Sequence, residues 1–214
     1  MNTENMPLMT EPTHLLRAND SDAIWKFAAY VKQGKLIVMP TDTVYGLGCD
    51  AFNAQAIAEL YRVKERPLSK GIPILLAEVN QIYEVASYIP DSARQLMRRF
   101  WPGPLTLILP KNPKLPANIS PDATVAVRIP DHSVTRAIIR MGSGAMAVTS
   151  ANMSGEGVIL NSMDAMQVFN GRVAAVLDDG ISPQSMASTI VDCTSENLRV
   201  LREGPIAKHD LFLN

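Results

Sequence analysis

The chain has 214 residues, of which 47% are hydrophobic and 19% are charged. This composition excludes a disordered polymer, and the length suits one domain that can bury a sizeable core. The 20 basic and 21 acidic residues give a net charge of -1, so no global basic field favours nucleic acid or anionic membranes, and any anion site must be local.

Two features predict a soluble, cytoplasmic protein without a membrane partner. The longest apolar runs, such as 72–77, are far shorter than the ~18 residues that a membrane span requires. Cys49 and Cys193 are too few for a disulfide scaffold or a complete zinc cage, so we expect both thiols to be free and reduced. Residues 1–12 carry neither a basic cluster nor an apolar core, which predicts a flexible tail rather than a signal sequence.

The first elements along the chain are a helix and a buried strand. Apolar residues recur at helical spacing within 20–33, and Gly34 can terminate this helix. The run 35–39 predicts a buried strand that ends at Pro40. A second helix is predicted over 55–63.

Strand-like and helical patterns then alternate to the end of the chain. Strands are predicted at 72–77, 105–109, 124–129, 145–149, 173–177, 188–192 and 198–201, and helices at 90–100, 132–141 and 162–169. This alternation predicts a single α/β or α+β domain over 13–214.

The first segment with chemical potential is 40–48, which reads PTDTVYGLG and follows the first strand. Small hydroxyls and two glycines let a ligand approach the backbone closely, and ligands bind at such strand ends. A tight turn capped by Thr41 and Asp42 explains the same residues equally well.

The second segment is KERP, in which Lys64 and Arg66 stand two residues apart and Lys70 follows. Pro67 favours an extended chain, so Lys64 and Arg66 are predicted to share a face and to bind one anion, such as a polyphosphate. The alternative is a helix end whose cations face solvent.

Polar side chains also end or line three later strands. Ser150 and Asn152 stand two apart after the strand at 145–149, and Arg128 lies on the otherwise small-residue face of the strand at 124–129. Ser188 begins a strand and Arg202 precedes a glycine. Turn-forming side chains and surface salt bridges are the competing explanations.

Several common catalytic motifs are missing from the sequence. No GxxxxGK[ST], GxGxxG, HExxH or GxSxG pattern occurs, which disfavours P-loop, Rossmann, zincin and α/β-hydrolase chemistry. The three histidines are scattered, so we expect no histidine base.

Taken together and in order, the segments resemble the YrdC/TsaC family, the threonylcarbamoyl-AMP synthases, in its short, single-domain form. The segments are PTDTVYGLG, KERP, WPGPLTLIL, VRIP, TSANMSG, STIVD and REG, and they span roughly 18–206. The Lys, Arg, Ser and Asn that distinguish this family are matched by Lys64, Arg66, Ser150 and Asn152. A paralogous branch lacks this quartet, so its presence favours a working synthase.

The resemblance implies a twisted mixed sheet with helices around an open, positively lined concave face. It implies a nucleotidyltransferase that combines L-threonine, bicarbonate and ATP with Mg²⁺ to give threonylcarbamoyl-AMP and pyrophosphate. The product would pass to a tRNA threonylcarbamoyl-transferase complex, and weak tRNA binding is a further expectation.

The resemblance also implies a role for each matched residue. Lys64 and Arg66 would be catalytic and would clamp the ATP phosphates, and no protein side chain is expected to bind the metal. L-threonine would contact Thr43, Arg128 and Ser188, and ATP would contact Lys64, Arg66, Thr106, Ser150, Asn152 and Arg202.

This sequence departs from the family pattern in two places. Some relatives carry a threonine-binding His in the strand after the KxR turn, where this chain has an apolar run through Leu75. Residues 156–162 read EGVILNS instead of a Pro/Ser/Thr-rich loop, and we expect either a mobile lid over the cleft or a short core strand there.

Two rival functions remain from the sequence. A non-enzymatic module could bind tRNA or duplex RNA on the same cationic cleft, but dedicated binders carry a clear basic excess. A carbamoyl-adenylate enzyme that uses carbamoyl phosphate, as in hydrogenase maturation, belongs to much longer chains.

Overall fold

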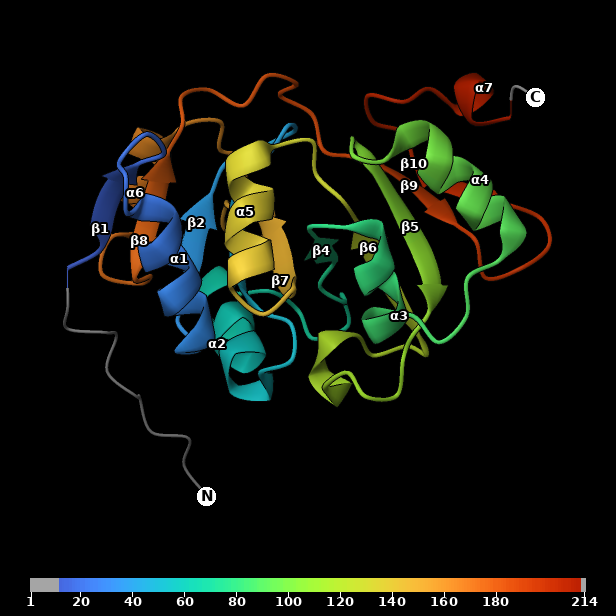
Figure 1. Cartoon of the computed structure of the whole chain (residues 1–214), viewed down its shortest axis with the longest axis horizontal. Coiled ribbons are helices and arrows are strands. Elements are labelled where there is room, and N and C mark those ends of the chain that lie inside the picture. The colour runs from blue at the N-terminus through green and yellow to red at the C-terminus, as the bar shows by residue number, and fades with distance from the viewer. Residues whose placement is uncertain (1–11, 213–214) are drawn as a thin grey trace.

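Ten strands join one mixed sheet in the order β1-β8-β2-β3-β7-β4-β6-β5-β9-β10 (Figure 1). The computed structural model describes residues 12–212, so the tail predicted at 1–12 lies, except for its last residue, outside the described residues. β8 runs parallel to β1 and β2, β4 to β6, and β5 to β9, whereas the other neighbours are antiparallel. The predicted α/β class with a mixed sheet is confirmed.

The elements have the following bounds. The strands are β1 (His14–Arg17), β2 (Ile37–Met39), β3 (Gly46–Asp50), β4 (Ile74–Leu76), β5 (Leu105–Pro110), β6 (Thr124–Arg128), β7 (Ala145–Ser150), β8 (Ala175–Asp178), β9 (Thr189–Asp192) and β10 (Arg199–Arg202). The helices are α1 (Ala23–Lys32), α2 (Ala54–Lys64), α3 (Ile82–Val85), α4 (Asp91–Phe100), α5 (Ser133–Met141), α6 (Ser162–Phe169) and α7 (Lys208–Leu211), with 3-10 turns at Val79–Gln81 and Ala117–Ile119.

All predicted helices and strands are present, but β1, β3, α3 and α7 were not predicted. β1 is a largely exposed edge strand and therefore has no apolar run. β3 contains two glycines, which are poor strand formers and which the sequence places in a turn. α3 and α7 have four residues each, too few for a helical repeat to be recognised.

The two faces of the sheet bury separate apolar clusters. Helices α2, α3, α4 and α6 contribute to the larger cluster, together with inward residues such as Leu47, Ile74 and Leu107. Helices α1 and α5 contribute to the smaller cluster on the other face, with Met146 and Val148 of β7. In Figure 1, α1 and α5 lie side by side over the half of the sheet that contains β2 and β7.

The half of this second face that α1 and α5 leave uncovered carries polar side chains. Leu75 of β4 belongs to the α1/α5 cluster and is the register partner of Arg128 on β6, so Arg128 points to the same side of the sheet. Because side chains alternate along a strand, Ala126 and Thr124 share that side as well. β5 continues the face with Ile108, the partner of Ala126.

A long connection, residues 179–188, joins β8 near one edge of the sheet to β9 near the other (Figure 1, orange). It is fixed at its start, where the Tyr45 hydroxyl donates to the carbonyl of Gly180 at 2.8 Å. The Ser182 hydroxyl donates to the carbonyl of Thr41 at 3.1 Å. These two hydrogen bonds hold the turn after β2 against the connection that leads to β9.

Within residues 12–212, no helix combines the length and the apolar character needed to cross a bilayer.

Candidate active site

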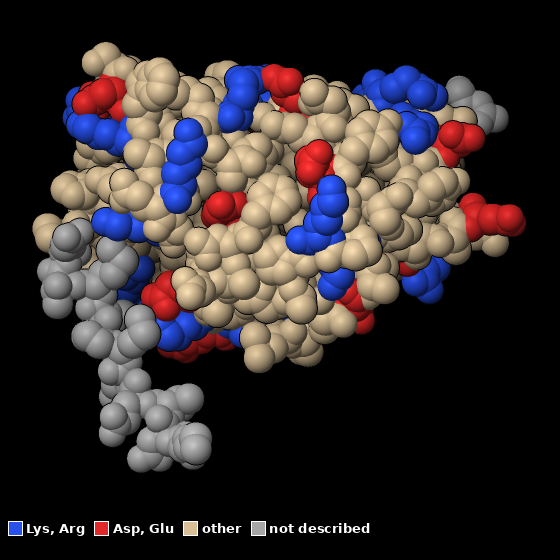
Figure 2. Space-filling view, turned by 60° about the horizontal axis from the view of Figure 1, so that its bottom comes forward, with Lys and Arg blue, Asp and Glu red and all other residues tan. Residues whose placement is uncertain are grey.

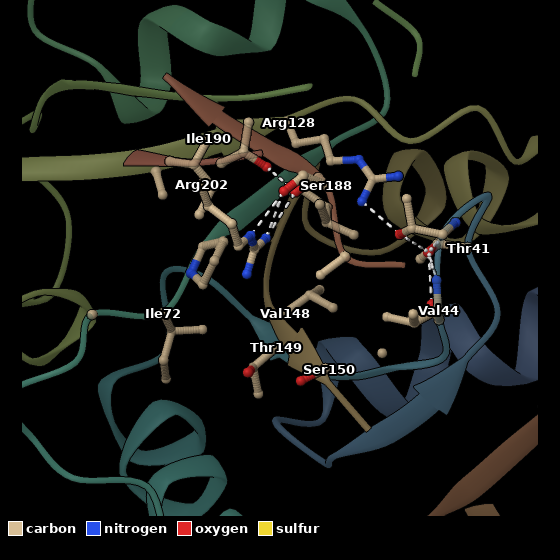
Figure 3. A pocket seen from close by; sticks show the side chains of 18 of the residues that line it. Thr41, Val44, Ile72, Arg128, Val148, Thr149, Ser150, Ser188, Ile190 and Arg202 are labelled. Carbon is tan, nitrogen blue, oxygen red and sulfur yellow. Dashed lines mark hydrogen bonds between the residues drawn. The ribbon is translucent and has the colours of Figure 1, made fainter. Parts of the chain in front are cut away.

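A cavity of about 360 Å³ lies on the half-face of the sheet that the helices leave open (Figure 3). The residues that line it are far apart in the sequence. They come from β3, β7, β4, β6 and β5 and, near the C-terminal end of the described chain, from β9 and β10. The predicted site residues among the lining are Thr43, Arg66, Thr106, Arg128, Ser150, Ser188 and Arg202. The structure therefore brings together seven of the nine residues predicted from the sequence.

Arg128 is buried, and its guanidinium is fixed on three sides. Its Nε donates to the carbonyl of Gly103 at 2.9 Å, and its Nη1 donates to Thr43 Oγ1 at 2.8 Å. Its Nη2 donates to the carboxylate of Asp42, which is itself buried and whose Oδ2 accepts no hydrogen bond from the described residues. The guanidinium is thus held in one orientation at the wall of the cavity.

A second polar group connects β5, β9 and β10. Thr106 Oγ1 lies 2.7 Å from Ser188 Oγ, and the Arg202 guanidinium donates to the carbonyl of Ser188 from Nε at 2.9 Å and from Nη2 at 2.8 Å. In Figure 3, Arg128 and Arg202 lie on either side of Ser188, and Ser150 lies across the cavity from them. Arg128 and Ser188, two of the three predicted threonine contacts, therefore lie near each other.

The turn between β2 and β3 is organised by Thr41. Its hydroxyl accepts from the backbone N–H of Thr43 at 3.1 Å and of Val44 at 3.2 Å, and lies 2.9 Å from the Thr43 hydroxyl. The tight turn capped by Thr41 is therefore present, and it directs Thr43 into the cavity, so both interpretations of this segment hold together.

The two glycines of this segment have a packing role that the sequence did not predict. Gly46 and Gly48 lie in β3 opposite β7, where a Cβ on Gly46 would stand 2.6 Å from Val148 Cγ1 and one on Gly48 would stand 2.9 Å from Val148 Cγ2. They make room for Val148, whose side chain reaches the cavity. Gly46 also lines the cavity, so the expectation that these glycines let a ligand approach the backbone stays a prediction.

Lys64 and Arg66 diverge, contrary to the extended conformation predicted for KERP. Lys64 is the last residue of α2, and Glu65 adopts a left-handed conformation with φ 53° and ψ 40°, which turns the chain between the two cations. Arg66 lines the cavity and donates from Nε to the carbonyl of Lys70 at 2.9 Å and from Nη2 to that of Gly71 at 2.7 Å. Helix α2 ends at Lys64 and Glu65 is left-handed, so the preference of Pro67 for an extended chain does not determine the conformation between Lys64 and Arg66.

Lys64 and Asn152 are not among the residues that line the cavity, although Lys64 bonds to Ser150, which does line it. Both are buried, and the Lys64 ammonium donates to the carbonyls of Ser150 and Asn152 at 2.5 and 2.7 Å and to Asn152 Oδ1 at 3.3 Å. Burial, with a smaller effect of nearby Arg66, lowers the pKa of Lys64 to about 8.

The cavity is electropositive. Burial lowers the pKa values of Arg66, Arg128 and Arg202, and the charge of Arg202 adds to the effect on Arg128 although Asp42 opposes it. Closely spaced, partly dehydrated cations are stabilised when an anion binds between them. Asp122 is the single acidic residue among the lining side chains.

Neither a metal cluster nor a reactive thiol is found in the described part of the chain. No group of three or more His, Cys, Asp or Glu side chains stands close enough to hold a metal ion within residues 12–212. Cys49 and Cys193 are free and buried, and burial raises the pKa of both thiols.

Sequence reasoning missed the partners that orient the predicted residues. Asp42 was assigned to a turn, yet it pairs with Arg128 across 86 positions of the chain. An Arg on a small-residue strand face was a signal that a buried acidic partner exists, but nothing local identified which acid.

A family model described as "Telomere recombination", for the Sua5, YciO and YrdC proteins, matches residues 29–204. The chain belongs to this Sua5/YciO/YrdC family. A Mycobacterium tuberculosis relative is 42% identical over 179 residues, which cover 83% of this chain and 82% of that one. The Bacillus subtilis protein named threonylcarbamoyl-AMP synthase is 35% identical and covers 93% of this chain, but only 58% of its own length is matched.

Solved structures of the family agree with the fold. Pyrococcus abyssi Sua5 complexed with L-threonine superposes with a TM-score of 0.84 at 34% identity, over 90% of this chain and 57% of that one. Escherichia coli YciO has the same fold, with a TM-score of 0.83 at 21% identity over 94% of this chain and 98% of that one. This chain therefore spans little more than half the length of the longer relatives.

Proposed function

We propose that this chain is a threonylcarbamoyl-AMP synthase, which makes threonylcarbamoyl-AMP and pyrophosphate from L-threonine, bicarbonate and ATP. The observation that carries the proposal is a cavity in which three arginines and the hydroxyls of Thr43, Thr106 and Ser188 converge. The names of the Bacillus subtilis relative and of the threonine complex of Pyrococcus abyssi Sua5 support the same reaction.

The reaction needs positioning and charge neutralisation rather than a covalent nucleophile. The amine of threonine attacks the carbon of bicarbonate with loss of water, or that of its dehydrated form, CO₂, with loss of a proton, and either route gives a carbamate. A carbamate oxygen then attacks the α-phosphorus in line, and pyrophosphate leaves as the P–O bond to the β-phosphate breaks. Cations held in fixed positions stabilise the charge that develops on the phosphoryl oxygens.

The three arginines supply such cations from separate strands and turns. We assign Arg128, with Thr43 and Ser188 beside it, to the threonine end of the cavity. We assign Arg66, Arg202, Thr106 and Ser150 to ATP. Mg²⁺ would enter with ATP as part of the substrate, because one lining carboxylate suits a metal that is held mainly by phosphates and water.

Further parts of the proposal concern the surroundings of the enzyme. The product would be used by a transferase that modifies tRNA, and the reaction would take place in the cytoplasm. The rival function as an RNA-binding module has less support, because acidic and basic side chains are interspersed on the face shown in Figure 2 and the net charge is -1.

The test follows pyrophosphate release by the purified protein with MgATP, bicarbonate and each amino acid in turn. We expect release that needs both threonine and bicarbonate, and loss of about 10²-fold in Arg66→Met, which removes a fixed charge contact. Arg62→Met is the matched control, because Arg62 lies four positions before Arg66, near the end of α2, and pairs with Glu59 and not with the cavity. Equal release without threonine, or with every amino acid, would contradict the proposal.

A further inference from the structure

The Lys64 ammonium has no hydrogen left to donate to a substrate. An ammonium group has three N–H donors. Three oxygen atoms accept from Nζ, namely the carbonyls of Ser150 and Asn152 and the Oδ1 of Asn152, at 2.5, 2.7 and 3.3 Å. Since the pKa of about 8 leaves Lys64 mostly charged at pH 7, this arrangement is a filled cation site made of oxygen atoms.

The oxygens belong to one segment, the Ser150–Glu156 turn, which begins at the last residue of β7. The Asn152 Nδ2 donates to the carbonyls of Met153 and Glu156, both at 2.8 Å, so that Oδ1 must face Lys64. The backbone N–H of Ser154 donates to the carbonyl of Lys64 at 3.2 Å. The turn is therefore wrapped around the end of α2 and its ammonium.

Without the ammonium, three buried or half-buried oxygens would converge with no donor between them. Each buried acceptor left without a partner costs free energy, and converging carbonyl dipoles also repel one another. The turn would open, and Ser150, which lines the cavity beside it, would lose its fixed place.

We propose that Lys64 is a positioning residue, which acts on the nucleotide through the Ser150–Glu156 turn that closes around its ammonium, while Arg66 is the cation of this pair that meets the ligand. This proposal rests on the proposed function and assigns different tasks to the two cations of KERP. The left-handed Glu65 separates these tasks, because it points Lys64 into the turn and Arg66 to the cavity.

The first experiment measures amide hydrogen exchange in the ligand-free protein by NMR. In Lys64→Met, the amides of Asn152, Ser154 and Glu156 are expected to exchange about tenfold faster than in the wild type, because their turn has lost its centre. Arg66→Met is the matched control and leaves these three amides unchanged, since its guanidinium bonds to Lys70 and Gly71 instead.

The second experiment restores the cation from solution. In Lys64→Ala, n-propylammonium is expected to restore both the slow exchange of the turn and pyrophosphate release, whereas tetramethylammonium, which has no N–H, restores neither. Should Lys64→Met fail to fold, Lys64→Gln keeps two N–H donors without the charge and is expected to accelerate exchange of the same three amides, and wild-type exchange there would contradict the proposal.

One result would overturn the proposal: wild-type exchange of the turn in ligand-free Lys64→Met, with a defect that appears only when ATP is added. Lys64 would then contact the phosphates itself. The exchange experiment contains no substrate, so it remains decisive for Lys64 even if no amino acid supports pyrophosphate release, an outcome that would count against the proposed function alone.

Discussion

The pairing of Asp42 with Arg128 determines which atoms of the arginine face the cavity. Both side chains are about 7% exposed, and Gly103 and Thr43 take two further N–H groups of the guanidinium. A buried ion pair contributes little compared with an apolar pair of the same size, but removal of one partner leaves an unpaired buried charge. Asp42 is therefore needed as long as Arg128 is present.

Asp42→Asn should destabilise the fold by about 3 kcal/mol, because it leaves the Arg128 charge buried without its counter-ion. The double variant Asp42→Asn with Arg128→Leu should recover most of this loss, since neither charge remains. Urea unfolding of the wild type, both single variants and the double variant gives the interaction energy. Additive effects would show that the two charges do not interact.

His132 gives the fold a dependence on pH. Its Nδ1 accepts from the backbone N–H of Thr135 at 3.3 Å at the start of α5, and its Nε2 lies 3.3 Å from Asp179 Oδ2. Burial lowers the pKa of His132 below its ordinary 6.5, although Asp179, Asp42 and Asp131 oppose this shift. The unfolded chain therefore takes up a proton first as the pH falls.

Stability should accordingly fall as the pH drops below 6.5, and His132→Asn should reduce this fall, because Asn offers a cap acceptor that does not titrate. Urea unfolding of both proteins at pH 7.5 and pH 5 measures the difference. The wild type is expected to lose more stability than the variant. An equal loss in both would mean that His132 does not contribute.

At the scale of elements, Gly204, which follows β10, packs so closely against the backbone at the start of β9 that it cannot be replaced without movement. A Cβ on Gly204 would lie 2.3 Å from the carbonyl oxygen of Ala187 and 2.6 Å from the nitrogen of Thr189. The backbone N–H of Gly204 also donates to Thr189 Oγ1 at 2.9 Å. This close approach holds Ser188 and Arg202 at the cavity.

Gly204→Ala should therefore weaken substrate binding, with a loss of stability of about 1–3 kcal/mol for the forced displacement. Gly157→Ala is the matched control, because nothing lies within 4 Å of a Cβ there. KM values for ATP and threonine, together with melting temperatures, test this. Wild-type KM values in Gly204→Ala would refute the positioning role of this contact.

The segment 156–162 packs in part against the core. Ile159 is buried and its carbonyl accepts from the N–H of Tyr45 at 3.0 Å, while the carbonyl of Leu160 accepts from the N–H of Ser182 at 2.9 Å. The segment is not a strand, but these contacts match the expectation of a core segment better than that of a lid.

Exchange of the Tyr45 and Ser182 amides should therefore be slow in the ligand-free protein and unchanged by ATP with threonine. The same NMR experiment, run with and without both substrates, measures it. Fast exchange that becomes slow on binding would restore the lid hypothesis for 156–162.

At the scale of the whole molecule, the features that could be predicted from the sequence are those that depend on residues close together in the chain. Alternating apolar runs and helical spacing are set by neighbours in the chain, so every predicted helix and strand is present, and β1 and β3 are the strands that this pattern missed. Hydroxyls at strand ends and Arg128 on its strand face indicated the site for the same reason.

The rest depends on contacts between distant residues. The direction of Lys64 is decided by carbonyls 86 and 88 positions further along, and nothing within KERP encodes them. The extended conformation predicted there was wrong because the last turn of α2 and the left-handed Glu65 prevailed. The partners Asp42 and Arg128 are separated in the same way.

The crossing from β8 to β9 also constrains how the chain can fold. β1 and β2 both take β8 as their parallel partner, and the Thr13 hydroxyl bonds to the carbonyl of Val173, 160 positions away. Such a high contact order predicts slow refolding, on the order of milliseconds to seconds. Ser188, Ile190 and Arg202 line the cavity from the last two strands of the sheet, so during synthesis the cavity should form only after β9 and β10 have emerged from the ribosome.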